Sequence, residues 1–269
     1  MIYKIIITKK ILERKNNYKI CYNLNMKSYK TASIFKSLPI EIFYYSAKQK
    51  TRHTVILLKG LYGLHDSKSN TSWDNEVIKS LKGKYNFICI NTARRETGGK
   101  EKHNQKSFTG KTFKQECDDV YKAYQYLIDQ KVISKEQKLS IMANSFGGTT
   151  LLGIPQLIRK SSSIIMVGSG CGKSLTTTKP LLKTLFNEDI LLKAISSYKG
   201  IFAYIRGEKD TIVPKESQEK IIQAFKSASI KVVYEIRGAQ HNLTSVTKTN
   251  SINRQEILTS ILENTLALI

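Results

Sequence analysis

The sequence is poor in several residue types, and each scarcity narrows the choice of fold. Its 269 residues include only four cysteines, four prolines and one tryptophan. The cysteines lack the paired spacing of a zinc module, and they are too sparse for a disulfide framework. They are Cys21, Cys89, Cys117 and Cys171. We therefore expect reduced thiols, a cytoplasmic location, no metal and no cofactor.

Long apolar runs are also lacking. No stretch reaches the roughly 18 to 20 uninterrupted apolar residues that a membrane-spanning helix needs. The hydrophobic fraction of 41% is nevertheless ordinary for a globular protein, and the length suits one compact domain. The composition argues against integral membrane, collagen, coiled-coil and disordered classes.

Acidic residues are scarce relative to basic ones, with 21 Asp and Glu against 44 Lys and Arg and a formal net charge of +23. Such a charge is typical of proteins that bind nucleic acid or an anionic membrane surface. Only eight of the basic residues are arginines, and no nucleic-acid-binding motif is present, which argues against nucleic acid as the partner. Peripheral contact with an anionic membrane stays open.

The excess of positive charge is densest at the start of the chain. Residues 1–25 carry six basic residues and one acidic residue, without a clean hydrophobic period or a signal-peptide cleavage site. We interpret residues 1–27 as a basic extension, either disordered or upstream of a true start at Met26. Residues 28–269 are predicted to form one domain.

From residue 28 onward, short apolar segments alternate with helical patterns. Strands are expected at 31–35, 40–46, 54–59, 85–91, 138–144, 163–168, 201–207 and 231–238. Helices are expected near 72–83, 113–130, 146–159, 181–196, 215–227 and 251–267. This alternation predicts an α/β fold with a doubly wound, mostly parallel, eight-stranded sheet and helices on both faces. Ligands of such sheets bind at the carboxyl ends of the strands.

The loop after 138–144 reads Ala143-Asn144-Ser145-Phe146-Gly147. A sharp strand-to-helix turn holds the central residue in strained backbone geometry and needs small residues on both sides, here Ala143 and Gly147. With Ala in place of the usual first glycine, the motif resembles the nucleophile elbow of the α/β-hydrolase family. The plain alternative is that Ser145 only caps the following helix.

Two later loops match the same family. Asp210 follows 201–207 with the family's spacing to Gly207 and Pro214, and His241 follows 231–238 as the only histidine after Ser145. The resemblance implies a catalytic triad in which Asp210 orients His241 and His241 takes the proton of Ser145. A turn-capping Asp210 and a merely solvated His241 are the alternatives.

The resemblance further implies an oxyanion hole made by the backbone N–H groups of Phe146 and Leu61. Family members commonly carry His-Gly where this chain has Lys59-Gly60, and the role of Lys59 stays open. Tyr62 and Cys171 are predicted to border the substrate pocket. Arg94 and Arg95 are interpreted either as contacts for an acidic substrate group or as part of a solvated loop.

Two features of residues 168–200 bear on the ligand. The sequence from Gly168 to Ser174 looks like a phosphate-binding loop, but only three residues separate Gly168 from Gly172 where four are needed, which argues against nucleotide binding. The segment 171–200 is too short for a large cap, so a small cap or none is expected. Its leucines suit either a small lid or packing of a helix against the sheet.

The predicted function is that of a serine hydrolase acting on a carboxylic ester or thioester of a small-molecule acyl substrate. Small members of the family that lack a large cap resemble carboxylesterases, lysophospholipase-like enzymes and serine-aminopeptidase-like enzymes. Acyl transfer on the same triad is one alternative. A non-catalytic binding protein of this fold, docked on an anionic surface, is another. The sequence does not indicate an oligomeric state.

Overall fold

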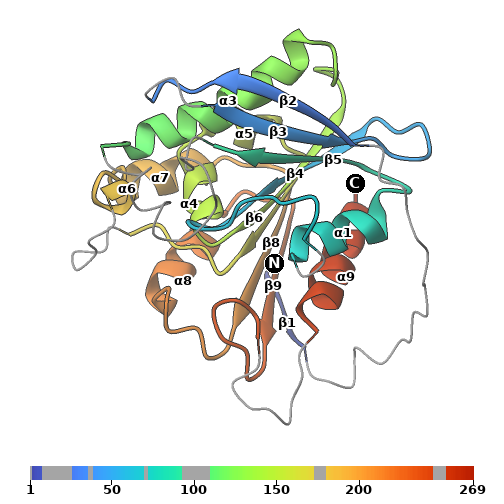
Figure 1. Cartoon of the computed structure of the whole chain (residues 1–269). Coiled ribbons are helices and arrows are strands. Elements are labelled where there is room, and N and C mark those ends of the chain that lie inside the picture. Colours follow the sequence, from blue (N-terminus) through green and yellow to red (C-terminus); the bar gives the residue numbers. More distant parts are fainter. Residues whose placement is uncertain are drawn as a thin grey trace.

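A nine-stranded sheet forms the centre of the computed structural model, which describes residues 2–7, 26–35, 39–69, 72–92, 110–172, 180–244 and 253–269 (Figure 1). The strand order is β1-β9-β8-β7-β6-β4-β5-β3-β2. The strands are β1 (Ile2–Ile7), β2 (Met26–Ala32), β3 (Pro39–Tyr45), β4 (His53–Leu58), β5 (Asn86–Asn91), β6 (Lys138–Asn144), β7 (Ser163–Val167), β8 (Ile201–Gly207) and β9 (Ile230–Ile236). β3 pairs antiparallel with β2 and β5, and the remaining pairs are parallel. The predicted fold class is confirmed.

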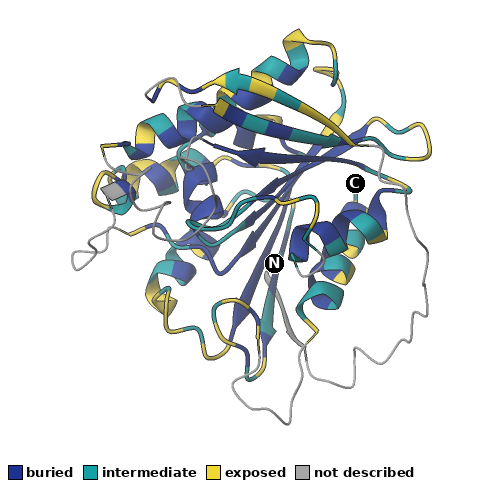
Figure 2. Cartoon of the chain, in the orientation of Figure 1, coloured by how far each residue is buried: buried dark blue, intermediate teal, exposed yellow. Residues whose placement is uncertain are grey.

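The inner strands are apolar almost throughout because helices cover both faces of the sheet. Every residue of β4, β5, β7 and β8 is buried (Figure 2). Along β4 the side chains alternate between two core clusters, with Ile56 and Leu58 in one and Val55 and Leu57 in the other. This alternation follows from the two-residue period of a strand.

The helices divide between the two faces. The second core cluster is completed by α1 (Trp73–Leu81) and α9 (Arg254–Leu266), which lie together on one side of the sheet (Figure 1). The first is covered by α3 (Phe113–Asp129), α4 (Phe146–Leu152), α5 (Pro155–Lys160), α6 (Pro180–Lys183), α7 (Glu188–Ile195) and α8 (Lys215–Ala224). No helix in the described parts of the chain combines the length and the apolar character needed to cross a membrane.

Two of the predicted helices are each divided in the structure. The helix expected at 146–159 is interrupted between α4 and α5, where Pro155 begins the second helix at a position that needs no backbone donor. The helix expected near 181–196 is interrupted between α6 and α7, where the side chain of Asn187 accepts a hydrogen bond from the N–H of Asp189. In both places a local signal, a proline or a capping asparagine, starts a new helix.

The ninth strand comes from the segment interpreted as an extension outside the domain. β1 runs parallel to β9, with Ile2 opposite Lys231 and Ile7 opposite Ile236. We expected eight strands because residues 1–25 show no clean hydrophobic period. A strand at the edge of a sheet, however, pairs through its backbone with one neighbour only, and this pairing does not require a regular hydrophobic period. Residues 2–7 thus belong to the sheet.

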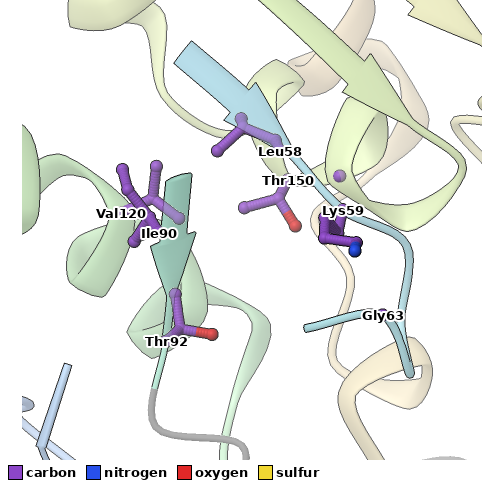
Figure 3. A pocket seen from close by; sticks show the side chains of 8 residues that line it. Leu58, Lys59, Gly63, Ile90, Thr92, Val120 and Thr150 are labelled. Carbon is purple, nitrogen blue, oxygen red and sulfur yellow. The ribbon is translucent and has the colours of Figure 1, made fainter. Parts of the chain in front are cut away.

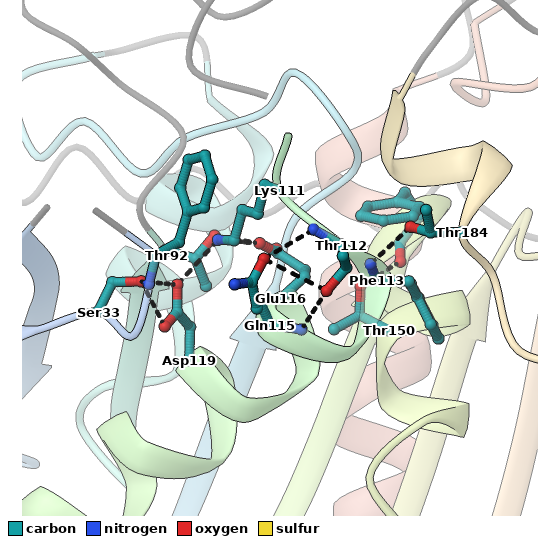
Figure 4. Close-up of polar contacts among 12 residues, drawn as sticks. Ser33, Thr92, Lys111, Thr112, Phe113, Gln115, Glu116, Asp119, Thr150 and Thr184 are labelled. Atoms are coloured by element: carbon teal, nitrogen blue, oxygen red, sulfur yellow. Dashed lines mark hydrogen bonds and ion pairs between the residues drawn. The ribbon is translucent and has the colours of Figure 1, made fainter. Parts of the chain in front are cut away.

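A buried ion cluster fastens the start of α3 to the sheet (Figure 4). The Lys111 ammonium donates to Glu116 at 2.7 Å and to Asp119 at 2.8 Å, and all three side chains are fully buried. Ser33, after β2, donates to Asp119, and Thr92, after β5, donates to Glu116. Lys111 and the two hydroxyls thus give hydrogen bonds to both buried carboxylates, which buried charges require.

Candidate active site

Ser145 occupies the sharp turn between β6 and α4. Its backbone angles are φ 52° and ψ −121°, a left-handed conformation that is uncommon for a residue other than glycine. Its N–H donates to the carbonyl of Val167 at 2.7 Å. A Cβ atom at Gly147 would lie 2.6 Å from the Leu58 carbonyl oxygen, so this position admits only glycine. The small-residue requirement seen in the sequence is therefore steric.

Of the three residues predicted as a triad, His241 lies within hydrogen-bond distance of both others. The His241 Nε2 atom is 2.9 Å from Ser145 Oγ, and His241 Nδ1 is 2.9 Å from Asp210 Oδ2. An ionised carboxylate only accepts hydrogen bonds, so Nδ1 donates to Asp210 and Nε2 of a neutral ring is left to accept from the serine hydroxyl. The geometry forms a continuous relay from Asp210 to Ser145.

Asp210 is held in its ionised form by its surroundings. Its Oδ1 accepts from the backbone N–H groups of Ile212 at 2.9 Å and Val213 at 3.2 Å. Gln218 Nε2 donates to Oδ2 at 3.2 Å. Burial acts to raise the pKa of this carboxyl, but the hydrogen bond and charge of His241, together with these backbone donors, outweigh it and leave the pKa lowered.

Glycines in two neighbouring loops allow close approach to His241. A Cβ at Gly207 would lie 2.4 Å from the carbonyl oxygens of Ala239 and Gln240, and a Cβ at Gly168, where φ is +54°, would lie 3.2 Å from His241 Nδ1. Gly168 opens the segment that looked like a phosphate-binding loop. The lack of a side chain at Gly168 lets this segment pack against His241. Residues 173–174 of the segment lie outside the described residues.

Similar architecture is found among solved structures. A cold-adapted esterase from an Arctic intertidal metagenomic library superposes with a TM-score of 0.64 at 13% identity, over 93% of this chain and 98% of that chain. The esterase domain of a Rhodothermus marinus protein gives 0.58 at 12% identity, over 90% and 99% of the two chains. The acylaminoacyl peptidase of Pyrococcus horikoshii gives 0.67 at 12% identity, over 91% and 41%.

The chain has the α/β-hydrolase fold. At these identities the likeness concerns the fold alone. No protein-family model matches the sequence, and no curated protein matches it either.

The loop after β4, which supplies an oxyanion donor in α/β-hydrolases, lies directly against the elbow. A Cβ at Gly60 would be 3.3 Å from Ser145 Cβ, and the Gly63 N–H closes a turn onto the Gly60 carbonyl at 3.0 Å. Leu61 and Phe146 line the same cavity as Ser145. The structure thus brings the two predicted donor residues to the nucleophile, and their role as donors stays a prediction.

Lys59 acquires a role that the sequence left open. The Lys59 side chain is almost buried. Its ammonium donates to Ser72 Oγ at 2.7 Å and to Asp74 Oδ1 at 2.9 Å. The other oxygen of Asp74 lies 2.6 Å from His65 Nδ1, and His65 Nε2 lies 2.6 Å from the Tyr45 hydroxyl. These contacts tie the loop 59–63 to the start of α1.

A cavity of about 560 Å³ opens beside Ser145 and His241. Its lining is mainly apolar and aromatic, and includes Leu61, Tyr62, Trp73, Phe146, Leu182, Leu185, Ile212, Val213 and Pro214. A volume of this size and composition is typical of a small-molecule site. Leu182 and Leu185 face the cavity while Leu181 and Leu191 are fully buried, so the segment serves both as pocket wall and as packing against the sheet.

The two predicted pocket residues differ in their placement. Tyr62 lines the cavity, whereas Cys171 does not, contrary to the prediction. The Cys171 side chain is fully buried, its N–H donates to Ser217 Oγ at 2.9 Å, and burial raises the pKa of its thiol to about 11. The neighbours Gly170 and Gly172 reach the cavity instead. Arg94 and Arg95 lie outside the described residues.

A second, much smaller cavity of about 10 Å³ lies behind the loop 59–63 (Figure 3). Its volume is about that of one water molecule, so it is too small for a substrate. It is lined by Leu58, Lys59, Gly63, Ile90, Thr92, Val120, Gly147 and Thr150.

One group of possible metal ligands occurs in the described part of the chain: His65, Asp74 and Cys89, whose ligand atoms lie within 4.8 Å of one another. Both ring nitrogens of His65 already have hydrogen-bond partners. Burial holds the pKa of the Cys89 thiol well above its usual value, so the thiolate that binds metals is disfavoured. Hydrogen bonding accounts for the group.

Proposed function

We propose that the chain is a serine hydrolase that cleaves carboxylic esters or thioesters through an acyl-enzyme on Ser145. The observation that carries this proposal is the relay Asp210–His241–Ser145, with both hydrogen bonds at 2.9 Å, at the edge of a cavity large enough for a small substrate. Each member comes from the carboxyl end of a different strand. A serine on a strained elbow with an oriented base is the arrangement that nucleophilic acyl transfer requires.

The reaction proceeds in two halves. Ser145 Oγ attacks the carbonyl carbon while His241 Nε2 accepts the hydroxyl proton, and the carbonyl oxygen becomes an oxyanion. Collapse of this intermediate breaks the bond to the leaving group, which takes the proton from His241. Water then repeats the sequence on the acyl-enzyme, with His241 as base and then acid, and releases the carboxylic acid and free Ser145.

The developing oxyanion is stabilised by the backbone N–H groups of Phe146 and Leu61. Phe146 begins α4, so its N–H belongs to the positive end of that helix. The contact of Gly60 with Ser145 supports the placement of Leu61, and the buried Lys59 holds this loop in position. Preorganised donors of this kind contribute about 100-fold to 1000-fold each in other hydrolases.

Ester cleavage is favoured over other acyl chemistry by the descriptions of the solved structures that share this fold. Solved structures similar to this chain are described as esterases, one of them with ferulic acid bound, although others are described as peptidases. Acyl transfer to an alcohol would use the same residues and differ only in the second half of the reaction. It is distinguished by whether added alcohol diverts the product from acid to new ester.

A fluorophosphonate probe tests the proposal directly. The folded protein should be labelled once, and mass spectrometry should place the label on Ser145. Ser145→Ala is the matched control because Oγ is lost without a change of fold. Absence of labelling in the folded protein, or equal labelling of Ser145→Ala, would overturn the proposal. A series of p-nitrophenyl esters of increasing acyl length then measures the depth of the cavity.

A further inference from the structure

Arg254 is an unexplained cation in the wall of the cavity. It is the first residue of α9, and it lines the cavity together with Trp73 and Lys59 from the face of the sheet that α1 and α9 cover. The guanidinium carbon lies 5.9 Å from the centroid of the Trp73 ring. An aromatic ring at this distance supports a cation and holds its plane without using its N–H donors.

Lys59 and Arg254, the two basic residues that line the cavity, differ in their hydrogen-bond partners. Lys59 donates to Asp74 and Ser72, whereas the Nε of Arg254 is buried without a hydrogen-bond partner. Within the described ranges no carboxylate forms an ion pair with Arg254, and residues 245–252, which precede α9, contain no Asp or Glu. Burial lowers the pKa of Arg254 to about 10, with Asp74 opposing the shift, so the side chain stays charged at neutral pH.

A buried hydrogen-bond donor without an acceptor is costly and is normally satisfied. Arg254 lines the cavity that contains Ser145, so a ligand bound there can supply the missing acceptor. The same cavity is lined by the apolar side chains of Leu182, Leu185 and Ile212, which come from other parts of the chain. The cavity therefore offers both a cation and apolar side chains to an ester bound at Ser145.

We propose that Arg254 binds a second anionic group of the ester substrate, a carboxylate or a phosphate. The inference rests on the proposed function and adds the substrate class: an ester with an apolar portion on one side of the scissile bond and an oxyanion on the other. A guanidinium can bind either oxyanion through two parallel hydrogen bonds. The net charge of +23 also attracts anionic substrates.

Matched esters test the substrate class. The 4-nitrophenyl monoester of adipic acid carries a terminal carboxylate, 4-nitrophenyl hexanoate ends in a methyl group at the same length, and the 6-phosphonooxyhexanoate supplies a phosphate. Because the leaving group is the same, the ratio of kcat/KM for anionic over neutral ester isolates recognition. A parallel pair, the hexanoyl esters of 4-hydroxybenzoate and 4-hydroxybenzamide, places the anion on the leaving group.

We expect the anionic ester to be preferred in at least one series, and Arg254→Gln to lower that preference about 10-fold to 100-fold, as loss of a charge-assisted hydrogen bond does. Arg254→Lys should restore part of it, since it keeps the charge but loses the paired donors. Arg159→Gln, at an exposed arginine of α5, is the control and should change neither rate. Equal losses on anionic and neutral esters in Arg254→Gln would assign Arg254 a purely structural role and overturn the inference, as would the absence of any anion preference.

A binding measurement separates this inference from the proposed chemistry. Trp73 is the only tryptophan of the chain and lies beside Arg254, so its fluorescence reports on the part of the cavity next to Arg254. In Ser145→Ala, monomethyl adipate or hexyl phosphate should produce a saturable change, and dimethyl adipate should not. The change should require at least 10-fold more ligand in the double variant with Arg254→Gln. A response to the neutral diester equal to that of the anions contradicts the inference, whatever the fluorophosphonate experiment shows.

Discussion

Two histidine–aspartate pairs of nearly the same form occur on the two sides of the loop 59–63. In one, His241 Nδ1 lies 2.9 Å from Asp210, and in the other His65 Nδ1 lies 2.6 Å from Asp74. The pairs differ in what the second ring nitrogen contacts. His241 Nε2 meets a serine hydroxyl at the edge of a cavity, whereas His65 Nε2 meets the buried hydroxyl of Tyr45.

Exposure separates the two pairs further. The His241 side chain is 18% exposed, whereas the side chains of His65 and Asp74 are 0% exposed. Burial also raises the pKa of Tyr45, so its hydroxyl stays protonated and donates to His65. We therefore expect the same pair of residue types to serve chemistry where it reaches a serine hydroxyl and a cavity, and to serve stability where it is closed on all sides.

The largest expected effect is on turnover. His241→Ala should lower kcat about 10⁴-fold or more, since the serine loses its base, while the free energy of unfolding changes by about 1 kcal/mol or less. Ester hydrolysis and urea unfolding of the same preparation measure the two quantities. If His241→Ala keeps more than a tenth of the activity, the His241–Asp210 pair is not catalytic and does not differ from the His65–Asp74 pair in this respect.

The second effect is on stability. Asp74→Ala leaves the ammonium of Lys59 and the ring of His65 without their buried partner, and should lower the free energy of unfolding by about 3 to 5 kcal/mol. Glu263→Gln is the control, because it breaks an exposed ion pair with Lys84 and should cost at most about 1 kcal/mol. Equal costs in the two variants would show that the buried network contributes no special stability.

A smaller effect is expected at the far end of the buried network. Tyr45→Phe removes only the hydroxyl that contacts His65 and should cost about 1 to 2 kcal/mol of stability. The measurement is urea unfolding at pH 7, with Tyr126→Phe, a half-buried tyrosine of α3, as the matched control. A cost equal to that of the control contradicts a structural role for the Tyr45 hydroxyl.

The smallest effect concerns acid. The folded-state pKa of Asp210 lies below its ordinary value of 3.8, so its contribution to stability is present above that pH and is lost as the pH falls through the folded-state pKa. Asp210→Asn lacks this contribution. The difference in unfolding free energy between wild type and Asp210→Asn should therefore narrow as the pH is lowered from 6 to 3. A difference that is constant over this range contradicts the assignment.

The triad candidates could be found from the sequence because each depends on local signals. Ser145 lies between small residues at a strand-to-helix turn, and Asp210 and His241 each follow an apolar strand at the edge where parallel strands end. The His65–Asp74 pair had no such signal. Its partners Lys59 and Tyr45 come from different strands, and only the packing of α1 against the loop 59–63 brings them together.

Other differences have the same origin. Cys171 follows a strand of the correct edge, but its side chain is buried against Ser217 of α8, a contact between residues 46 positions apart. The pairing of β1 with β9 joins opposite ends of the chain. Arg254 gave no sequence signal because its importance comes from lining a cavity whose other walls come mostly from distant parts of the chain, such as Lys59 and Ser145.

The sequence by itself determined the alternation of strands and helices from β2 onward, the strained position of Ser145 and the loops in which Asp210 and His241 lie, because hydrophobic period, small residues and strand ends are local properties of a chain. The tertiary structure alone decided which charges are paired. Lys59 forms an ion pair with Asp74, and Lys111 pairs with Glu116 and Asp119. Arg254 instead lines the cavity. Pairing of buried charges depends on distances between elements remote in sequence, and those distances exist only once the sheet and its helices have packed.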